Sequence, residues 1–276
     1  MIRATDEVVA INRKLEHVVA ERTAAPAARN AELAQANANL RQLDQMKSEF
    51  VSLVSHELRA PLTTMSGALE IALQHAEQMP FRLRHTLEVL ARENQRLTTL
   101  VQTILDLSRI EAGRLQVNLG PVAVRPLLQQ AAEVMLAQSS RRVVWEVCSA
   151  LPPAWADEIL LEQVLRNLIR NADVYSPAGE PICLSACLTD DGRMRIAVRD
   201  HGPGIPPEMQ QSIFERFARG RHGEHGPRGW GLGLYFARKL IERQQGEIGV
   251  ISPVWPDADR PGSEFYILLP LADSPD

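Results

Sequence analysis

The sequence predicts an α + α/β protein, in which a helical N-terminal part is followed by a two-layer α/β sandwich. Three observations indicate this order. Apolar residues recur at helical spacing from about residue 33 to residue 110. Beyond Gly113 the apolar runs are short and alternate with helical stretches. A length of 276 residues is typical of two domains, or of one domain with a long helical arm.

Composition and charge exclude several classes of protein. The chain is 45% hydrophobic with a net charge of −4, so we expect a proper core and no basic footprint for nucleic acid. No apolar run approaches the roughly 18 residues of a membrane helix, and no signal peptide opens the chain. The 3 cysteines lack zinc-ligand spacing and read as reduced thiols. We therefore expect a soluble, cytoplasmic protein.

Residues 1–45 are predicted to form a helical coiled coil that acts as a signalling linker. Leu33 and Leu40 share one heptad position, and Ala36 and Leu43 share the companion position. This seam continues into the next helix, which favours a parallel dimer. The alternative is a solvated helical spacer.

Residues 46–112 are predicted to form an antiparallel helical hairpin. The first helix includes Phe50–Gly67, in which Pro61 removes one helical hydrogen bond and predicts a bend. The second covers Phe81–Ile110, and Gly113 is a stop signal. One hairpin cannot bury both of its apolar stripes, so we expect a homodimer in which two copies form a four-helix bundle.

Residues 113–276 are predicted to form the α/β sandwich, with a mixed or largely antiparallel sheet. The expected strands are Leu115–Leu119, Val143–Val147, Ile182–Leu188, Met194–Val198, Ile248–Ile251 and Phe265–Leu269. The expected helices are Val124–Ala137, Ala156–Ala172, Pro207–Phe217 and Leu232–Gln245.

One histidine on the first hairpin helix is a candidate for chemistry. His56 lies on the polar side of that helix, next to Glu57. A lone histidine on a bundle helix is usually a surface residue, because imidazole is tolerated there without any function. Its neighbours, read as SHELRAPL, are what single it out.

Three blocks in the second half could bind a nucleotide. Asn167 and Asn171 are one helical turn apart, where two amides can offer oxygens to a hard cation, although asparagines often only hydrogen-bond locally. A strand ends in Asp200-His-Gly-Pro-Gly, which places a carboxylate beside closely approaching backbone; alone, this is a weak turn signal.

The third block is Gly229-Trp-Gly231-Leu-Gly233-Leu, which opens a helix and can present backbone N–H groups to phosphates. No apolar strand precedes these glycines, so a Rossmann site is excluded, and a Walker-type lysine motif is absent. The loop before them, rich in Gly, His and Arg, is typical of a mobile loop.

Together these motifs resemble the sensor histidine kinases of two-component systems. SHELRAPL resembles the phosphoacceptor box of the dimerisation domain. The later blocks, with Phe214 and Phe217 between them, resemble in order the N, G1, F and G2 boxes of the ATP-binding domain, which has the Bergerat-type fold. The resemblance covers about Gln45 to Pro270.

This resemblance implies binding of ATP and Mg²⁺, autophosphorylation of His56 assisted by Glu57, and transfer to an aspartate of a response-regulator receiver domain. It implies Asn171 as the Mg²⁺ ligand, Asp200 as the residue that reads adenine, and Tyr175 packed on the purine, although a core role for Tyr175 is an equal alternative. The whole implied nucleotide site is Asn167, Asn171, Tyr175, Asp200, Gly202, Gly204, Arg228, Gly229, Gly231, Gly233 and Leu234.

Two departures from the family pattern affect these expectations. Val174 stands where the family usually has lysine, so one phosphate contact must come from elsewhere. Ala60 replaces the Thr or Asn that positions a hydrolytic water, so we expect weak phosphatase activity. The alternatives are an inactive nucleotide-sensing scaffold that binds a regulator, and a gyrase-like ATPase. An upstream sensor domain or protein is a possible partner.

Overall fold

The computed structural model describes residues 35–37, 39, 46, 51, 53–55, 57–137, 139, 141–218, 230–255 and 259–272. The chain divides into two compact units, Met1–Glu57 and Leu58–Asp276. Nearly all of the predicted coiled coil lies outside the described residues, although 35–37 and 39 are helical. Apart from Glu57, every helix and strand named below lies in the second unit.

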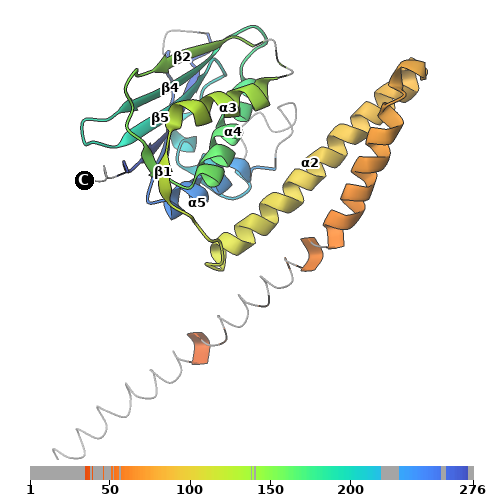
Figure 1. The fold of residues 1–276 in the computed structure, drawn as a ribbon, viewed down its shortest axis with the longest axis horizontal. Coiled ribbons are helices and arrows are strands. Elements are labelled where there is room, and N and C mark those ends of the chain that lie inside the picture. Colours follow the sequence, from red (N-terminus) through yellow and green to blue (C-terminus); the bar gives the residue numbers. More distant parts are fainter. Residues whose placement is uncertain are drawn as a thin grey trace, which may run out of the picture. The chain divides into compact units, whose positions relative to one another are not determined.

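A helical hairpin precedes the sandwich, as predicted (Figure 1). Residues 57–73 are helical through Pro61. A short 3₁₀ turn, η1 (Ala76–Gln78), leads to the long helix α2 (Phe81–Glu111). Gly113 then takes a left-handed φ of 68°, which ends the helix where the sequence predicts a stop.

Polar side chains fix the register of the two antiparallel helices. The buried Asn94 amide on α2 donates to the Leu62 carbonyl at 3.2 Å. Forty-three residues apart in sequence, Arg59 donates to Gln102 Oε1 at 2.8 Å. Leu62 pairs with Asn94, whereas the earlier residue Arg59 pairs with the later residue Gln102. This order shows that the two helices run antiparallel.

The hairpin leaves a line of leucines uncovered in the single chain. Leu83, Leu90 and Leu97 are seven residues apart on α2 and are 49%, 51% and 42% exposed. Leu58 and Met65, also seven apart, are similarly exposed on the first helix. We call these five residues the hairpin seam. Its heptad spacing is typical of a helix surface that packs against other helices.

The sandwich contains a five-stranded mixed sheet and a separate two-stranded ribbon. The strands are β1 (Gly120–Val122), β2 (Val143–Val147), β3 (Ala154–Ala156), β4 (Ile182–Leu188), β5 (Met194–Asp200), β6 (Glu247–Ile251) and β7 (Ser263–Leu269). The large sheet has the order β2-β4-β5-β7-β6, in which only β2 and β4 pair in parallel. The ribbon pairs β1 with β3.

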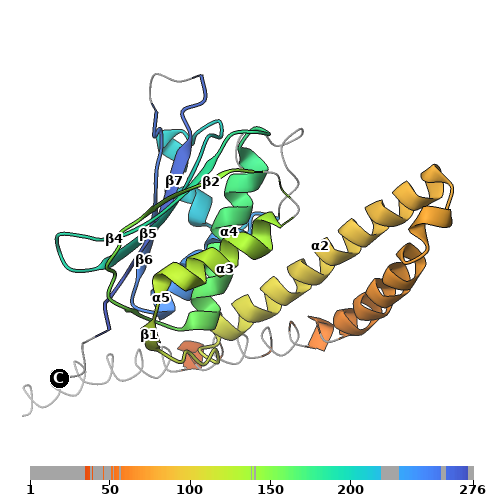
Figure 2. The ribbon, with the colours of Figure 1, turned by 45° about the horizontal axis from the view of Figure 1, so that its top comes forward.

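Three helices cover one face of this sheet (Figure 2). They are α3 (Val124–Leu136), α4 (Glu158–Tyr175) and α5 (Gly233–Arg243). The core lies between the layers and includes Leu165 and Leu168 of α4 and Ile196 of β5, all fully buried. Leu107 and Ile110, near the end of α2, also belong to this core. The α/β sandwich fold is therefore confirmed.

Two predicted elements are wrong. The strand expected at Leu115–Leu119 does not form. Instead, β1 begins at Gly120, because its partner is the short strand β3. The last residue of β3, Ala156, was predicted to begin a helix. The helix expected at Pro207–Phe217 is two 3₁₀ turns, η2 (Pro207–Met209) and η3 (Ser212–Phe214). Between them, the Gln210 side chain donates to the Ile205 carbonyl at 3.1 Å and holds the bent backbone.

Among the described residues, no helix combines the length and apolar character that crossing a bilayer requires.

Candidate nucleotide-binding site

Helix α4 carries the two asparagines of the first block. Asp157 caps its N-terminus by accepting from the N–H groups of Ile159 and Leu160, both at 3.1 Å. The apolar face of α4 packs on the sheet, which leaves Asn167 and Asn171 partly exposed. They are four residues apart and therefore one helical turn apart on the same helix. The helix thus presents both amides at the spacing that the sequence predicts.

Asn167 is packed directly against the start of α5. A Cβ atom placed on Gly233 would lie 2.6 Å from Asn167 Oδ1, so a larger residue there would displace the Asn167 side chain. Arg170 donates to the same oxygen at 3.1 Å. The Nδ2 group of Asn167 is buried and has no hydrogen-bond partner in the described part of the chain. A buried donor left open costs free energy, so it marks a place that a ligand oxygen would complete.

The glycine block lies beside the block of phenylalanines. Gly231 has a left-handed φ of 67°, and a Cβ atom there would lie 2.6 Å from the Ala218 carbonyl oxygen, next to Phe217. Phe214 anchors this segment in the core, with its ring centroid 6.4 Å from that of Phe265. The first turn of α5 has no side-chain cap, so its N–H groups suit an anion. Leu234, in that turn, packs against the core.

Asp200 lies buried at the end of β5. Its Oδ1 accepts from the Gly202 N–H at 2.7 Å. Burial raises the pKa of Asp200 to about 6, although hydrogen bonds from the N–H groups of Gly202 and Ser263 oppose that rise. The carboxylate is therefore ionised at neutral pH but sits in a poorly solvated place, where a hydrogen-bond donor on a ligand would be strongly favoured.

The end of α4 meets the turn that follows Asp200. A Cβ atom on Gly202 would lie 3.3 Å from the Tyr175 carbonyl oxygen, and Tyr175 as a whole is 46% exposed. Gly204 lies next, against the loop between β6 and β7, where Ser252 Oγ accepts from the Ile205 N–H at 2.8 Å. Two pairs of predicted residues are thus brought together, Asn167 with Gly233 and Tyr175 with Gly202.

Three predicted site residues, His56, Arg228 and Gly229, lie outside the described residues. Glu57 is described and is exposed on its helix. Val174, at the position where the family usually has lysine, is 46% exposed.

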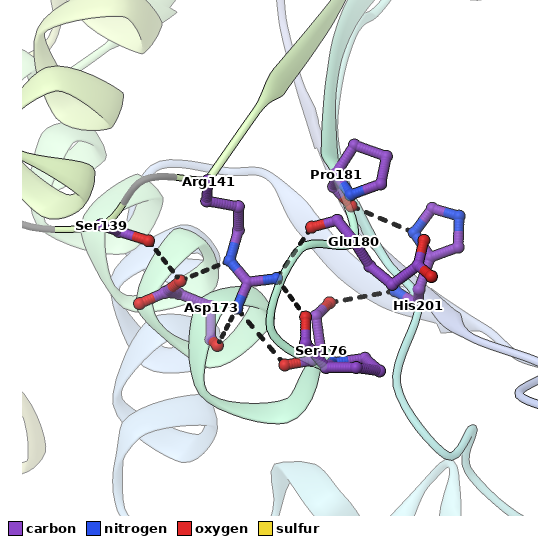
Figure 3. Close-up of polar contacts among 8 residues, drawn as sticks. Ser139, Arg141, Asp173, Ser176, Glu180, Pro181 and His201 are labelled. Carbon is purple, nitrogen blue, oxygen red and sulfur yellow. Dashed lines mark hydrogen bonds and ion pairs between the residues drawn. The ribbon is translucent and has the colours of Figure 1, made fainter.

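A polar cluster that was not predicted from the sequence lies at the end of α4 and contains Arg141, Asp173, Ser176 and His201 (Figure 3). Arg141 is the first of two arginines before a strand, a pattern that normally indicates solvated side chains. The one available signal was Asp173, an acidic residue placed between Asn171 and Tyr175.

Comparison with known families agrees with this geometry. Residues 156–273 match the family described as histidine kinase-, DNA gyrase B- and HSP90-like ATPase. Residues 46–113 match the His Kinase A (phospho-acceptor) domain. The chain belongs to the sensor histidine kinase family. The two matches occur in the order that the SHELRAPL box and the later boxes predict.

Relatives in this family are longer than the present chain. It is 34% identical to the adaptive-response sensory kinase SasA of Synechocystis sp. over 84% of this chain and 61% of the relative. It is 33% identical to the sensor protein SrrB of Staphylococcus aureus over 84% of this chain and 39% of that protein. The chain therefore spans about 39–61% of the length of these relatives.

A solved structure shows the same fold. The crystal structure of full-length ShkA in complex with AMPPNP matches with a TM-score of 0.66 and 31% identity, over 83% of this chain and 47% of that one.

Proposed function

We propose that the chain autophosphorylates on His56 with ATP and passes the phosphoryl group to an aspartate of a response-regulator receiver domain. The observation that carries this proposal is the open, buried Nδ2 donor of Asn167 against Gly233, at the uncapped start of α5. It is a ready donor for a phosphate oxygen in a chain that also carries a phosphoacceptor-type helix.

At the adenine end, the ionised Asp200 accepts a hydrogen bond from the exocyclic amine, and Gly202 and Gly204 let backbone approach the base. The exposed ring of Tyr175 packs on the purine. At the other end, Gly229, Gly231 and Gly233 present N–H groups to the phosphates, with Arg228 and Leu234 beside them. Asn171 offers its amide oxygen to Mg²⁺, which supplies charge neutralisation when bound.

Phosphoryl transfer to His56 is a displacement at the γ-phosphorus of ATP. The unprotonated ring nitrogen of neutral His56 attacks the γ-phosphorus, so a nitrogen–phosphorus bond forms while the bond to the oxygen of ADP breaks. The other ring nitrogen becomes more acidic, and Glu57 accepts its proton. The aspartate carboxylate of the receiver then displaces the histidine nitrogen at phosphorus.

The acting form is a homodimer. The hairpin seam is exposed in one chain, and a second copy would cover it by forming a four-helix bundle. We assign residues 1–45 to the signalling linker, 46–112 to dimerisation and phosphotransfer, and 113–276 to ATP binding. An upstream sensor domain or protein would act through the linker.

Phosphatase activity is proposed to be weak. Ala60 is exposed on the first hairpin helix, one turn beyond His56, and has no group to hold a water. The nearby Thr64 hydroxyl is engaged with the Ala60 carbonyl at 3.1 Å.

Labelling with γ-³²P-ATP and Mg²⁺ tests the proposal, with His56→Gln as the matched variant. We expect acid-labile, alkali-stable label in the wild type and none in the variant, because a phosphoramidate hydrolyses in acid. Label that persists in the variant would mean that another residue is the acceptor. Nucleotide binding without label in either protein would support the scaffold alternative, which the exposed Val174 favours.

A further inference from the structure

Arg141 makes an unusual number of hydrogen bonds to one short segment (Figure 3). Its Nε donates to Asp173 Oδ1 at 2.6 Å. Its Nη1 donates to the carbonyls of Pro177 and Glu180, both at 2.8 Å, and its Nη2 donates to the carbonyls of Asp173 and Ser176 at 3.0 and 3.3 Å. The Arg141 side chain is only 8% exposed.

These acceptors belong to the C-terminus of α4 and the connection to β4. The last carbonyls of a helix have no partner within the helix, and a cation there also complements the helix dipole. The planar guanidinium fork has five N–H donors and reaches all of these acceptors at once, whereas a lysine ammonium has only three donors. Arg141 therefore fixes the path of residues 173–180.

The same segment holds the turn that carries Asp200. Ser176 Oγ accepts from the His201 N–H at 3.1 Å, and the His201 ring nitrogen Nδ1 lies 3.0 Å from the Pro181 carbonyl oxygen. The His201 ring is in turn stacked on Trp255, with the centroids 4.2 Å apart. A continuous set of contacts thus runs from Arg141 through Ser176 to His201, which directly follows Asp200 in the chain.

We propose that Arg141 is a positioning residue for adenine recognition. It holds the end of α4 and the Ser176–Pro181 connection against the Asp200–Gly202 turn, so that the Asp200 carboxylate and the Tyr175 ring keep their mutual placement. This inference rests on the proposed function, in which Asp200 accepts from the adenine amine.

A purely structural role for Arg141 makes a different prediction. Loss of the partly buried Arg141–Asp173 ion pair would then lower the stability of the domain and weaken the binding of every nucleotide alike. A positioning role affects the base selectively. ITP separates the two, because it has the same triphosphate as ATP and an oxo group in place of the amine.

The experiment measures dissociation constants of ATP and ITP by calorimetry on the full chain, well below its melting transition. The variants are Arg141→Met, Arg141→Lys and, as a matched control, Arg142→Met, whose side chain is exposed. For Arg141→Met we expect ATP to bind about tenfold more weakly and ITP to change by less than about twofold. Arg141→Lys should fall between, and Arg142→Met should match the wild type.

Equal weakening of ATP and ITP in Arg141→Met, or no change in either, would overturn the inference. If Arg141→Met does not fold, Arg141→Lys is measured instead. A folded lysine variant that prefers ATP over ITP as strongly as the wild type does would also overturn the inference. A wild-type protein that does not prefer ATP to ITP would instead contradict the proposed role of Asp200.

Discussion

The sandwich and the hairpin bury their leucines differently. In the sandwich, Leu165 and Leu168 of α4 are fully covered by residues of the same chain. On the hairpin, Leu83 and Leu90 sit at regular heptad spacing and remain about half exposed. An apolar surface of that regularity is stable only when another helix covers it. The sandwich core is therefore covered within one chain, whereas covering the hairpin seam is the role of the second copy in the homodimer that we propose.

The largest expected effect is in the sandwich core. Leu168→Ala should lower the free energy of unfolding of the sandwich by about 3 kcal/mol, because it removes a fully buried side chain and leaves a cavity. Urea unfolding followed by tryptophan fluorescence measures this loss. The loss should be the same at all protein concentrations. A loss that depends on concentration would contradict the claim that the sandwich core is complete in one chain.

The hairpin should respond through association instead. The double variant Leu90→Glu/Leu97→Glu places unpaired charges in the seam and should raise the dimer dissociation constant about a hundredfold or more, as measured by sedimentation equilibrium. Gln95→Glu, exposed and on another side of α2, is the matched control and should leave the dimer intact. Unchanged association in the double variant would show that the seam is not the interface.

The pH dependence of ATP affinity tests whether Asp200 of the sandwich binds the adenine base. ATP affinity should fall about tenfold as the pH drops from 7.5 to 5, since Asp200, with its pKa raised to about 6, must be ionised to accept the adenine amine. The pKa of Asp200 is higher in the folded protein than in the unfolded chain. The contribution of Asp200 to the free energy of unfolding therefore decreases as the pH rises from about 4 to about 6.

Asp200→Asn controls for protonation of the nucleotide phosphates. The wild-type and variant affinity curves should converge below pH 6, and parallel curves throughout would contradict the assignment. Calorimetric titrations across the pH range provide both curves.

The smallest expected effect is on the hairpin surface. Ala60→Thr restores a hydroxyl one turn beyond His56 and should raise the rate of dephosphorylation of a phosphorylated receiver domain about threefold. Ala60→Val, which has nearly the same shape without the hydroxyl, should not. Equal rates in all three proteins would mean that the alanine does not limit the phosphatase reaction.

Local sequence pattern predicted the regular elements well. Val143–Val147 and Ile182–Leu188 are strands with the predicted bounds, because each has enough apolar residues to define a sheet face. The failure at Leu115–Leu119 has a non-local cause. The strand starts at Gly120 because β3, more than thirty residues later in sequence, offers a partner there.

Residue type and spacing predicted which side chains lie near one another in the candidate site, while their roles toward a nucleotide stay predictions. Such patterns predict Asn167, Gly233, Asp200 and Gly202. Asn167 lies against Gly233, and the Asp200 carboxylate accepts from the Gly202 N–H. Arg141 was not predictable, because its importance comes from carbonyl groups that any sequence possesses. Only the fold shows that those carbonyls converge on one guanidinium.

Equilibrium unfolding with two probes tests the contrast between the two regions most directly. Of the 4 tryptophans, Trp230 has Arg96 of α2 over its ring at 5.1 Å, so a Trp230→Phe variant is used, in which the fluorescence of Trp145, Trp155 and Trp255 reports the sandwich. Circular dichroism at 222 nm also reports the long hairpin helices. We predict a fluorescence midpoint that is independent of protein concentration and a helical transition that moves to higher urea as the concentration rises. Two coincident transitions, both independent of concentration, would contradict the account.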